Sequence, residues 1–247
     1  IDTETGEELW SYTPASVLSQ MYRLYIDDVS ATKEYILDGQ PALYILNDDG
    51  LPGFQGDGEE AILVMGMRRG GSNYFALNIT DKNAPNKLWE ISNEDSDFAG
   101  LGQSWSEPQF GKVNIDGADE NVVIFSGGYD NVQDIIGSYT EDTEGNAIYM
   151  VSLENGGLLW SAGKDEPHDL KLAKMVNSIP SAPLVIDTNR DGLLDRLYTG
   201  DMGGRLWRID FTNGNNRSNF AQGGAMAELG AAGASSPAAE DLRRFYT

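Results

Sequence analysis

The chain has 247 residues, 40% of them hydrophobic, no cysteine and a formal net charge of −22. The lack of cysteine excludes disulfides, thiol nucleophiles and Cys-ligated metal centres. The acidic balance argues against nucleic acid or an anionic membrane as a direct partner, because such contacts need clustered Lys and Arg. The chain contains no run of eighteen apolar residues, so we expect no direct membrane insertion. Its size and apolar content suit one or two folded domains.

Alternating apolar residues recur along the chain, and each run precedes a turn. Trp207, Ile209 and Phe211 alternate in LWRIDF, and the runs YFALNIT and IYMVSL repeat the pattern. A period of two indicates half-buried strands. Three copies close on a Leu-Trp pair, at Leu9–Trp10, Leu88–Trp89 and Leu159–Trp160. The fourth copy departs in NGNNRS and has no second Trp, so we expect its closing hairpin to be incomplete.

The repeated units predict an all-β fold of the β-propeller type. The positions Ile1, Leu77, Val151 and Ile209 mark successive copies, 76, 74 and 58 residues apart. Each unit holds several strands, and no long helical pattern separates the copies, which favours one blade per unit. A row of separate β-sandwich domains is the alternative, but these units are short for a sandwich. We therefore expect a partial ring, with about three blades of a propeller of about seven.

The expected blades divide the chain as parts of a single domain, 1–247. Residues 1–10 form the end of one blade, and the next units span 41–90, 107–160 and 181–215. Residues 12–25 read as a short amphipathic helix, with Val17, Leu18 and Met21 on its packing face. The Gly-, Ala- and Ser-rich stretch 222–236 reads as a flexible insertion. Because the pattern opens inside a unit, we expect any targeting sequence to lie upstream.

An acidic loop between two expected strands has the spacing of a calcium site. Carboxylate or amide side chains stand at positions 1, 3, 5 and 9, Gly192 is at position 6, and position 7 offers its backbone carbonyl. The expected ligands are Asp187, Asn189, Asp191, Leu193 and Asp195. Position 12 is Tyr198 rather than the Glu of an EF-hand, so the pattern predicts a calcium clip between strands. The alternative is an acidic turn without metal, since Asp, Asn and Gly also favour turns.

The preceding unit carries a partial copy of this spacing. Asn114, Asp116, Gly117 and Glu120 match its later positions, but Lys112 occupies position 1. An ammonium group there opposes cation binding. We interpret the stretch as a copy that has lost its calcium site.

Several stretches resemble the C-terminal β-propeller domains of the PilC/PilY family, the type IV pilus tip-associated adhesins and biogenesis factors of Gram-negative bacteria. The likeness covers nearly the whole chain. It is most specific in the calcium loop and the strand after it. The stretches that carry it are LWSYTPASVL, YILDGQPAL, GMRRGGSNYFALNITD, GLGQSWSEPQFGKV, VIFSGGYD and NSIPSAPLVIDTNRDGLLDRLYTGDMGGRLWRIDF.

The resemblance implies a non-enzymatic protein at the pilus tip or outer membrane, exposed at the cell surface. The family's calcium ligands fall on the loop residues named above. Calcium occupancy would regulate pilus extension against retraction, and with it attachment and twitching motility. The implied partners are minor pilins, with host or abiotic surfaces as possible adhesive targets.

Other functions fit parts of the pattern. Quinoprotein dehydrogenases also have Leu-Trp hairpins, but their calcium lies at the ring centre, whereas this loop lies within one blade. A carbohydrate- or protein-binding propeller outside the pilus is a third hypothesis, with Trp105 or Tyr129 as contacts. A hydrolase is disfavoured, because the single histidine, His168, lies in an acidic turn and reads as a solvated loop residue. No GxSxG elbow is present.

Overall fold

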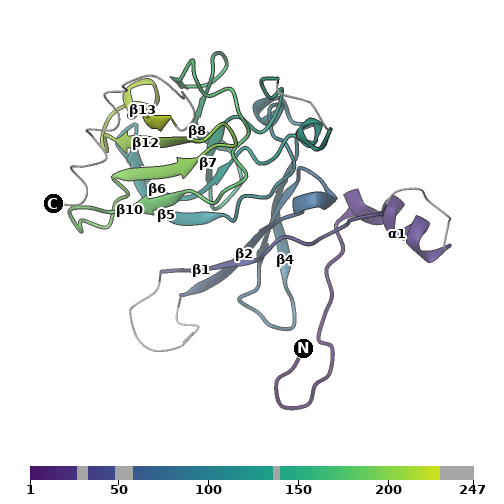
Figure 1. Ribbon diagram of the computed structural model, residues 1–247. Coiled ribbons are helices and arrows are strands. Elements are labelled where there is room, and N and C mark those ends of the chain that lie inside the picture. The colour runs from purple at the N-terminus through teal and green to yellow at the C-terminus, as the bar shows by residue number, and fades with distance from the viewer. Residues whose placement is uncertain (27–32, 48–57, 136–139, 229–247) are drawn as a thin grey trace.

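The strands of the computed structural model form three sheets, drawn in Figure 1, whose neighbouring strands are antiparallel except for one short parallel pair at the end of the second sheet. The structure describes residues 1–26, 33–47, 58–135 and 140–228. The first sheet contains β1 (Ala42–Leu46), β2 (Glu60–Gly66), β3 (Tyr74–Asn78) and β4 (Asn86–Ile91). The second contains β5 (Gln109–Ile115), β6 (Ala118–Ser126), β7 (Ile148–Ser152), β8 (Leu158–Gly163) and the short β9 (Leu170–Lys171). The third contains β10 (Leu184–Ile186), β11 (Arg196–Gly200), β12 (Arg205–Phe211) and β13 (Ala221–Glu228).

Helical structure is limited to short segments. The expected N-terminal helix is present as a 3₁₀ turn, Ala15–Val17, followed by α1 (Leu18–Tyr25). Further 3₁₀ turns are Arg68–Gly70, Ser96–Phe98, Asn131–Asp134 and Arg217–Asn219. Helix α1 projects away from the sheets in Figure 1, and its residues Leu18 and Met21 are exposed, contrary to their expected packing role. Val17, in the preceding 3₁₀ turn, is buried as expected. Within the described residues, no helix has the length and apolarity needed to cross a membrane.

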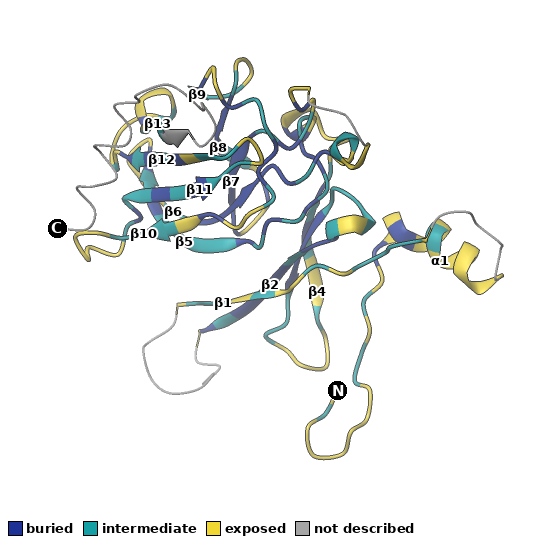
Figure 2. Cartoon of the chain, in the orientation of Figure 1, coloured by how far each residue is buried: buried dark blue, intermediate teal, exposed yellow. Residues whose placement is uncertain are grey.

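The middle sheet is packed on both faces, because adjacent residues of a strand point to opposite sides. One face forms a cluster with the third sheet, and the other forms a cluster with the first sheet. The first cluster includes Val122, Ile124, Ile148 and Met150 with Leu197, Trp207, Ile209 and Phe211. The second includes Val123, Phe125, Tyr149 and Val151 with Ile62, Val64, Tyr74 and Ala76. Figure 2 shows this buried region along β6 and β7. The predicted half-buried alternation is present in β12, whereas β7 is buried on both faces and β3 is buried at all but its last residue, so the prediction of half-buried strands is wrong for these two.

The tryptophan-marked hairpins occupy equivalent places in the first two sheets. Trp89 pairs with Ala76 and Trp160 pairs with Met150, and a register shift follows Ala76 and Met150. The indole N–H of Trp89 donates to the carbonyl of Leu153 in the next sheet at 2.9 Å. The Leu-Trp pattern therefore marks residues that join neighbouring sheets.

The third sheet has a fourth strand that the sequence reading missed. Residues 222–236 were expected to be flexible, but β13 covers their beginning and pairs with β12; residues 229–236 lie outside the described residues. A side chain at Gly223 would place its Cβ 2.4 Å from the carbonyl oxygen of Arg208. The small residues therefore let the two backbones approach, and the closing hairpin is complete. Residues 1–10 form only a turn, with the Gly6 N–H donating to the Asp2 carbonyl, so their assignment to a blade stays a prediction.

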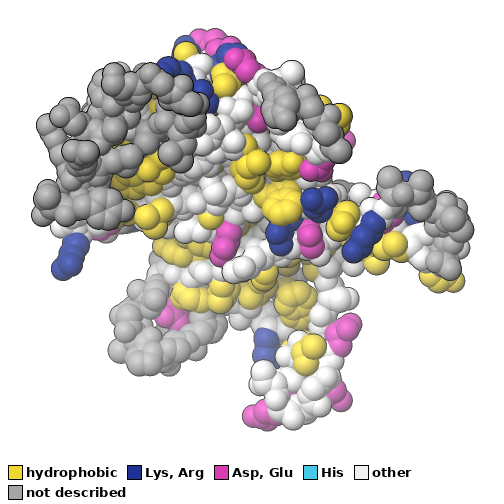
Figure 3. All heavy atoms as spheres, viewed as in Figure 1, with side chains coloured by type: hydrophobic (Ala, Val, Ile, Leu, Met, Phe, Trp, Pro, Cys, Tyr) yellow, Lys and Arg dark blue, Asp and Glu magenta, His cyan; other side chains and the backbone are white. Residues whose placement is uncertain are grey.

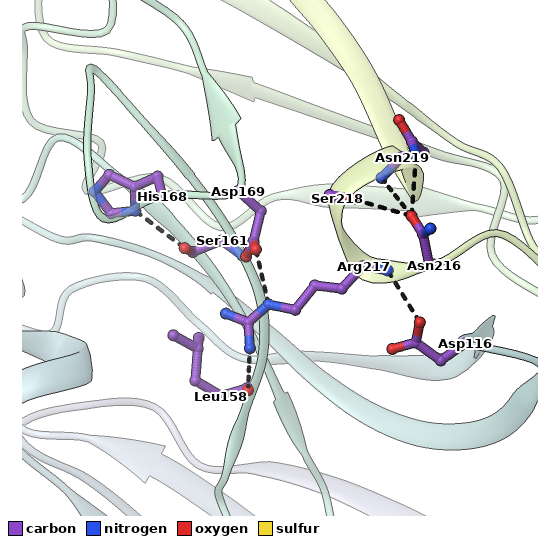
Figure 4. A network of polar contacts seen from close by, with 9 residues as sticks. All are labelled: Asp116, Leu158, Ser161, His168, Asp169, Asn216, Arg217, Ser218 and Asn219. Atoms are coloured by element: carbon purple, nitrogen blue, oxygen red, sulfur yellow. Dashed lines mark hydrogen bonds and ion pairs between the residues drawn. The ribbon is translucent and has the colours of Figure 1, made fainter.

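The β12–β13 connection holds the third sheet against the second (Figure 4). The Arg217 guanidinium donates to Asp169 at 2.8 Å and to the Leu158 carbonyl at 3.2 Å. Beside it, Ser161 contacts the ring of His168, whose half-buried position corrects the expected solvated loop residue. The Asp169 carboxylate accepts the backbone N–H of Ser161 and the guanidinium N–H of Arg217, whereas the described residues give no hydrogen bond between Asp169 and His168. The Ser, His and Asp therefore do not form the relay of a hydrolase.

Replacing Trp89 tests whether the tryptophans join the sheets. We expect Trp89→Ala to lower the free energy of unfolding by about 3–5 kcal/mol, because it leaves a cavity and an unpaired carbonyl. The control Leu43→Ala removes a side chain that is 58% exposed, and it should change stability by about 0.5 kcal/mol or less. Chemical denaturation measures both, and equal effects would contradict the packing role.

The single histidine makes the second prediction simple to measure. Burial lowers the pKa of His168 below its usual value of 6.5, against the opposing influence of Asp165, Asp169 and Glu166. The unfolded chain then takes up a proton at a higher pH than the folded chain does. The contribution of His168 to the free energy of unfolding is therefore fully present above about pH 6.5 and decreases as the pH drops below that value.

An NMR titration of the imidazole resonances should give a pKa below 6.5. In His168→Gln the stability loss between about pH 6.5 and the folded pKa should become smaller. An ordinary or raised pKa would contradict the burial argument.

Candidate metal-binding loop

The acidic loop lies between two strands, as predicted. It runs from Asp187, directly after β10, to Asp195, directly before β11. The pairing of Ile186 with Arg196 brings the two ends together at the strand termini. Gly192 has a φ of +89°, a conformation that glycine adopts without strain. The loop is therefore a connection within one sheet rather than half of a helix–loop–helix unit.

The first part of the loop is held by its own side chains. Asp187 accepts hydrogen bonds from the backbone N–H groups of Arg190, at 2.6 Å, and Gly192, at 2.9 Å. Asn189 donates through its amide to Asp191 at 3.0 Å, and Asp191 also accepts the N–H of Leu193 at 2.9 Å. Backbone N–H groups of the loop itself thus satisfy the carboxylates of Asp187 and Asp191.

Asp195 closes the loop through a contact that the sequence reading missed. Its carboxylate accepts the hydroxyl of Thr188 at 2.5 Å and the N–H groups of Thr188 and Asn189 at 2.7 and 3.3 Å. These hydrogen bonds, with that of the Thr188 hydroxyl foremost, lower the pKa of Asp195 below its usual value. Asp195 is therefore ionised throughout the neutral pH range. In the sequence, the signal for this contact is Thr188, at position 2 of the loop pattern.

The predicted ligands share one loop, but their carboxylates are not gathered around one point. Among the described residues, no group of three or more His, Asp or Glu side chains is arranged to hold a metal ion. In that same part of the chain, no ion pair joins Asp187, Asp191 or Asp195 to a Lys or Arg. Arg196, next to Asp195, instead pairs with Asp210 at 2.9 Å. The three carboxylates of the loop therefore form no ion pair among these residues, although the nearby charge of Arg196 helps to lower the pKa of Asp195.

The donor set of the loop matches the chemistry of a hard cation. Every predicted ligand offers oxygen, and Ca²⁺ is bound in proteins by carboxylate, amide and carbonyl oxygens. The carbonyl of Leu193 accepts no hydrogen bond from the described residues, so this oxygen is available. The residues fit a calcium ion if the exposed Asp191 and Asn189 turn inward.

The end of the loop is attached to the second sheet. The N–H of Leu194 donates to the carbonyl of Lys112 on β5 at 2.8 Å. The amide of Asn213 donates to the Leu194 carbonyl at 3.0 Å and accepts the N–H of Asn114 at 2.8 Å. Loop geometry is thereby linked to the contact between the second and third sheets. Asn213 lies well beyond the loop in sequence, so the spacing gave no signal for it.

The expected lost copy of the site is a tight turn. Asp116 and Gly117 connect β5 to β6, and both have positive φ values, +55° and +80°. The Lys112 ammonium pairs with Asp119 at 3.0 Å. A two-residue turn has no room to surround an ion, so this stretch differs from the acidic loop in length as well as in charge.

Comparisons with known proteins match the fold and the repeats described above. A family model described as the PilY1 beta-propeller domain matches residues 16–237. The type IV pilus biogenesis factor PilY1 of Pseudomonas aeruginosa strain PAO1 is 27% identical over 219 residues, covering 86% of this chain and 16% of the relative. A PilY1 homologue of Xylella fastidiosa strain Temecula1 is 26% identical over 212 residues, covering 86% and 15%.

A solved structure has the same fold. The crystal structure of the Pseudomonas aeruginosa PilY1 C-terminal domain superimposes with a TM-score of 0.55 at 24% identity, covering 83% of this chain and 35% of that one. The three sheets thus correspond to part of a β-propeller, which confirms the predicted fold class, while the number of blades in the whole ring stays a prediction. Together with the family match, this shows that the chain belongs to the PilY1 β-propeller domain family.

Proposed function

We propose that this chain is part of the calcium-binding propeller of a type IV pilus biogenesis protein at the surface of a Gram-negative bacterium. The family match and the two relatives, both named as pilus biogenesis factors, support the pilus assignment. The chain spans about a sixth of the length of these relatives. The observation that carries the calcium assignment is the loop Asp187–Asp195, with its oxygen donors in the spacing of a calcium site and three carboxylates without ion-pair partners in the described residues.

Calcium binding would act through the charge of the loop. Three close carboxylates repel one another, and a divalent cation relieves this repulsion while accepting their oxygens. Asp187, Asn189, Asp191 and Asp195 would supply side-chain oxygens, and Leu193 its carbonyl. The backbone N–H groups that now donate to these carboxylates can keep their hydrogen bonds when calcium binds, because an ionised carboxylate accepts more than one contact.

The attachment of the loop suggests how occupancy is transmitted. Leu194 follows the proposed carbonyl ligand directly and is bonded to β5 of the neighbouring sheet. Ordering the loop would therefore stabilise the contact between the second and third sheets. In the pilus, we propose that this change of propeller stiffness favours extension over retraction, with consequences for attachment and twitching motility.

The same proposal covers partners and catalysis. Minor pilins are the proposed partners, with a host or abiotic surface as the adhesive target. We propose no enzymatic role. A cation bound by the oxygens of a single loop would leave few positions for a substrate, which disfavours the dehydrogenase alternative.

Calorimetry tests the metal site. We expect one Ca²⁺ per chain, with a dissociation constant between about 10⁻⁷ and 10⁻³ M. Asp191→Ala removes a central carboxylate and should weaken binding at least about tenfold. The matched control Asp81→Ala removes an exposed carboxylate from the connection between β3 and β4 and should leave the affinity unchanged. Equal affinities in the two variants, or no calcium binding in the parent chain, would refute the site.

A second test addresses regulation in cells. Asp195→Lys places an ammonium near the proposed ion position and should imitate permanent occupancy, whereas Asp191→Ala should imitate the empty loop. Introduced into the full-length protein, Asp195→Lys should preserve surface pili and Asp191→Ala should reduce them. Counting surface pili by electron microscopy distinguishes the variants, and an equal loss in both would refute the imitation of occupancy.

A further inference from the structure

The connections after β2, β4 and β6 meet and bring basic and aromatic side chains together. The N–H of Arg68 donates to the carbonyl of Ser104 at 3.2 Å, and Gln103 and Tyr129 exchange two backbone hydrogen bonds of 2.9 Å. Trp105 follows directly after these residues. Figure 3 shows basic side chains beside a hydrophobic patch between the sheets and α1. We name Arg68, Arg69, Trp105 and Tyr129 the cationic-aromatic cluster.

Two guanidinium groups lie over the half-buried indole at the centre of this cluster. The guanidinium carbon of Arg68 is 4.4 Å from the Trp105 ring centroid, and that of Arg69 is 5.6 Å from it. Tyr129 meets the Trp105 ring edge-on, with ring centroids 6.2 Å apart. A guanidinium held against an aromatic ring keeps its in-plane N–H donors, which match the two oxygens of a carboxylate.

The backbone of Arg68 is strained in this position. Its φ is +51°, in the left-handed region that residues other than glycine rarely occupy. The turn cannot easily relax, because a Cβ at Gly70 would lie 1.7 Å from the Ile36 carbonyl oxygen. Strained backbone that the surroundings enforce is common at binding sites. The strain here places the Arg68 side chain over Trp105.

The cluster is electrostatically incomplete. Among the described residues, neither Arg68 nor Arg69 forms an ion pair, although the chain carries a net charge of −22. Within the described part of the chain, the Arg68 side chain donates only to the backbone carbonyl of Asp38, at 3.5 Å, while the Asp38 carboxylate accepts the backbone N–H of Arg69 at 3.2 Å. By contrast, Arg217 and Arg196 each have a carboxylate at hydrogen-bond distance. Two adjacent unpaired guanidinium groups favour an anion.

A cavity of about 210 Å³ opens beside Arg68 and indicates the remaining chemistry of the ligand. Arg68 and Trp105 line it together with Gln40 and Glu107, whose side chains are 3.3 Å apart. Amide and carboxylate oxygens accept hydroxyl groups, and an aromatic side chain packs against aliphatic C–H groups. The Glu107 carboxylate repels any anion, and because this repulsion grows with the number of negative charges, it favours a ligand with one carboxylate over a densely charged acidic peptide. The lining suits a ligand with one carboxylate and several hydroxyls.

We propose that the cationic-aromatic cluster and this cavity bind a carboxylated sugar. Arg68, which lines the cavity, holds the carboxylate, and Arg69 adds a second positive charge from beside the cavity. Gln40 and Glu107 contact hydroxyl groups, and Trp105 packs against the sugar ring. The cluster lies on connections after β2, β4 and β6, whereas the acidic loop lies on the connection between β10 and β11. Sugar binding is therefore separate from the proposed calcium site.

Calorimetry with the 247-residue chain and simple probes tests this site. We expect saturable binding of D-glucuronate or N-acetylneuraminate, and much weaker binding of D-glucose, which lacks the carboxylate, and of acetate, which lacks the ring. Arg68→Gln removes the guanidinium group that lines the cavity and should weaken binding at least about tenfold, and Arg68→Lys should give an intermediate value. Lys82→Gln, which removes one exposed charge elsewhere, should bind like the parent chain.

Thermal unfolding of each variant verifies that the fold is kept. The proposal is overturned if neither acidic sugar binds at millimolar concentration, if glucose binds equally well, or if Arg68→Gln binds like Lys82→Gln. Tighter binding of an Asp- and Glu-rich peptide than of either sugar would assign the cluster to a protein partner and also overturn it. The Asp191→Ala variant should retain sugar binding, so failure of the calcium site and failure of this site are distinguishable.

Discussion

The two-sided burial of the middle sheet is the constraint on which the rest of the structure depends. Successive residues of β6 and β7 enter the cluster shared with the third sheet and the cluster shared with the first sheet in turn. Both faces must therefore be apolar, and no strand can slip by one residue without exchanging its contacts on both sides. This fixed register sets where each connection emerges. The acidic loop and the cationic-aromatic cluster owe their positions to it.

Hydrogen bonds between sheets add orientation to this packing. Trp89 reaches the backbone of Leu153, Asn213 joins Asn114 to Leu194, and Arg217 joins Asp169 to the β12–β13 connection. Each contact satisfies a polar group at the boundary of an apolar cluster, where an unmet hydrogen bond would be costly. The last connection thereby holds two sheets together, and the acidic loop is part of the same network. A cation bound in that loop would act on a contact between sheets.

Charge is distributed unevenly over this strongly acidic protein. In the acidic loop, carboxylates are satisfied by backbone N–H groups and by Thr188, which keeps Asp195 ionised. In the cationic-aromatic cluster, guanidinium groups lie on an indole instead of on carboxylates. Both arrangements leave charge available to a ligand, and they call for ligands of opposite sign. They lie on connections of different strands, so one domain can offer two independent contacts.

The sequence by itself determined the strands, their alternation and the place of the acidic loop, because these depend on residues close together in the chain. Trp207, Ile209 and Phe211 revealed a buried face, and the spacing from Asp187 to Asp195 revealed the loop. The tertiary structure decided what depends on distant partners. Strand β13 looked flexible because its small residues carry no pattern, yet they let it approach β12. Likewise, Arg68 and Trp105 are in contact only because the packed sheets bring their connections together, and no local sequence pattern predicts this contact.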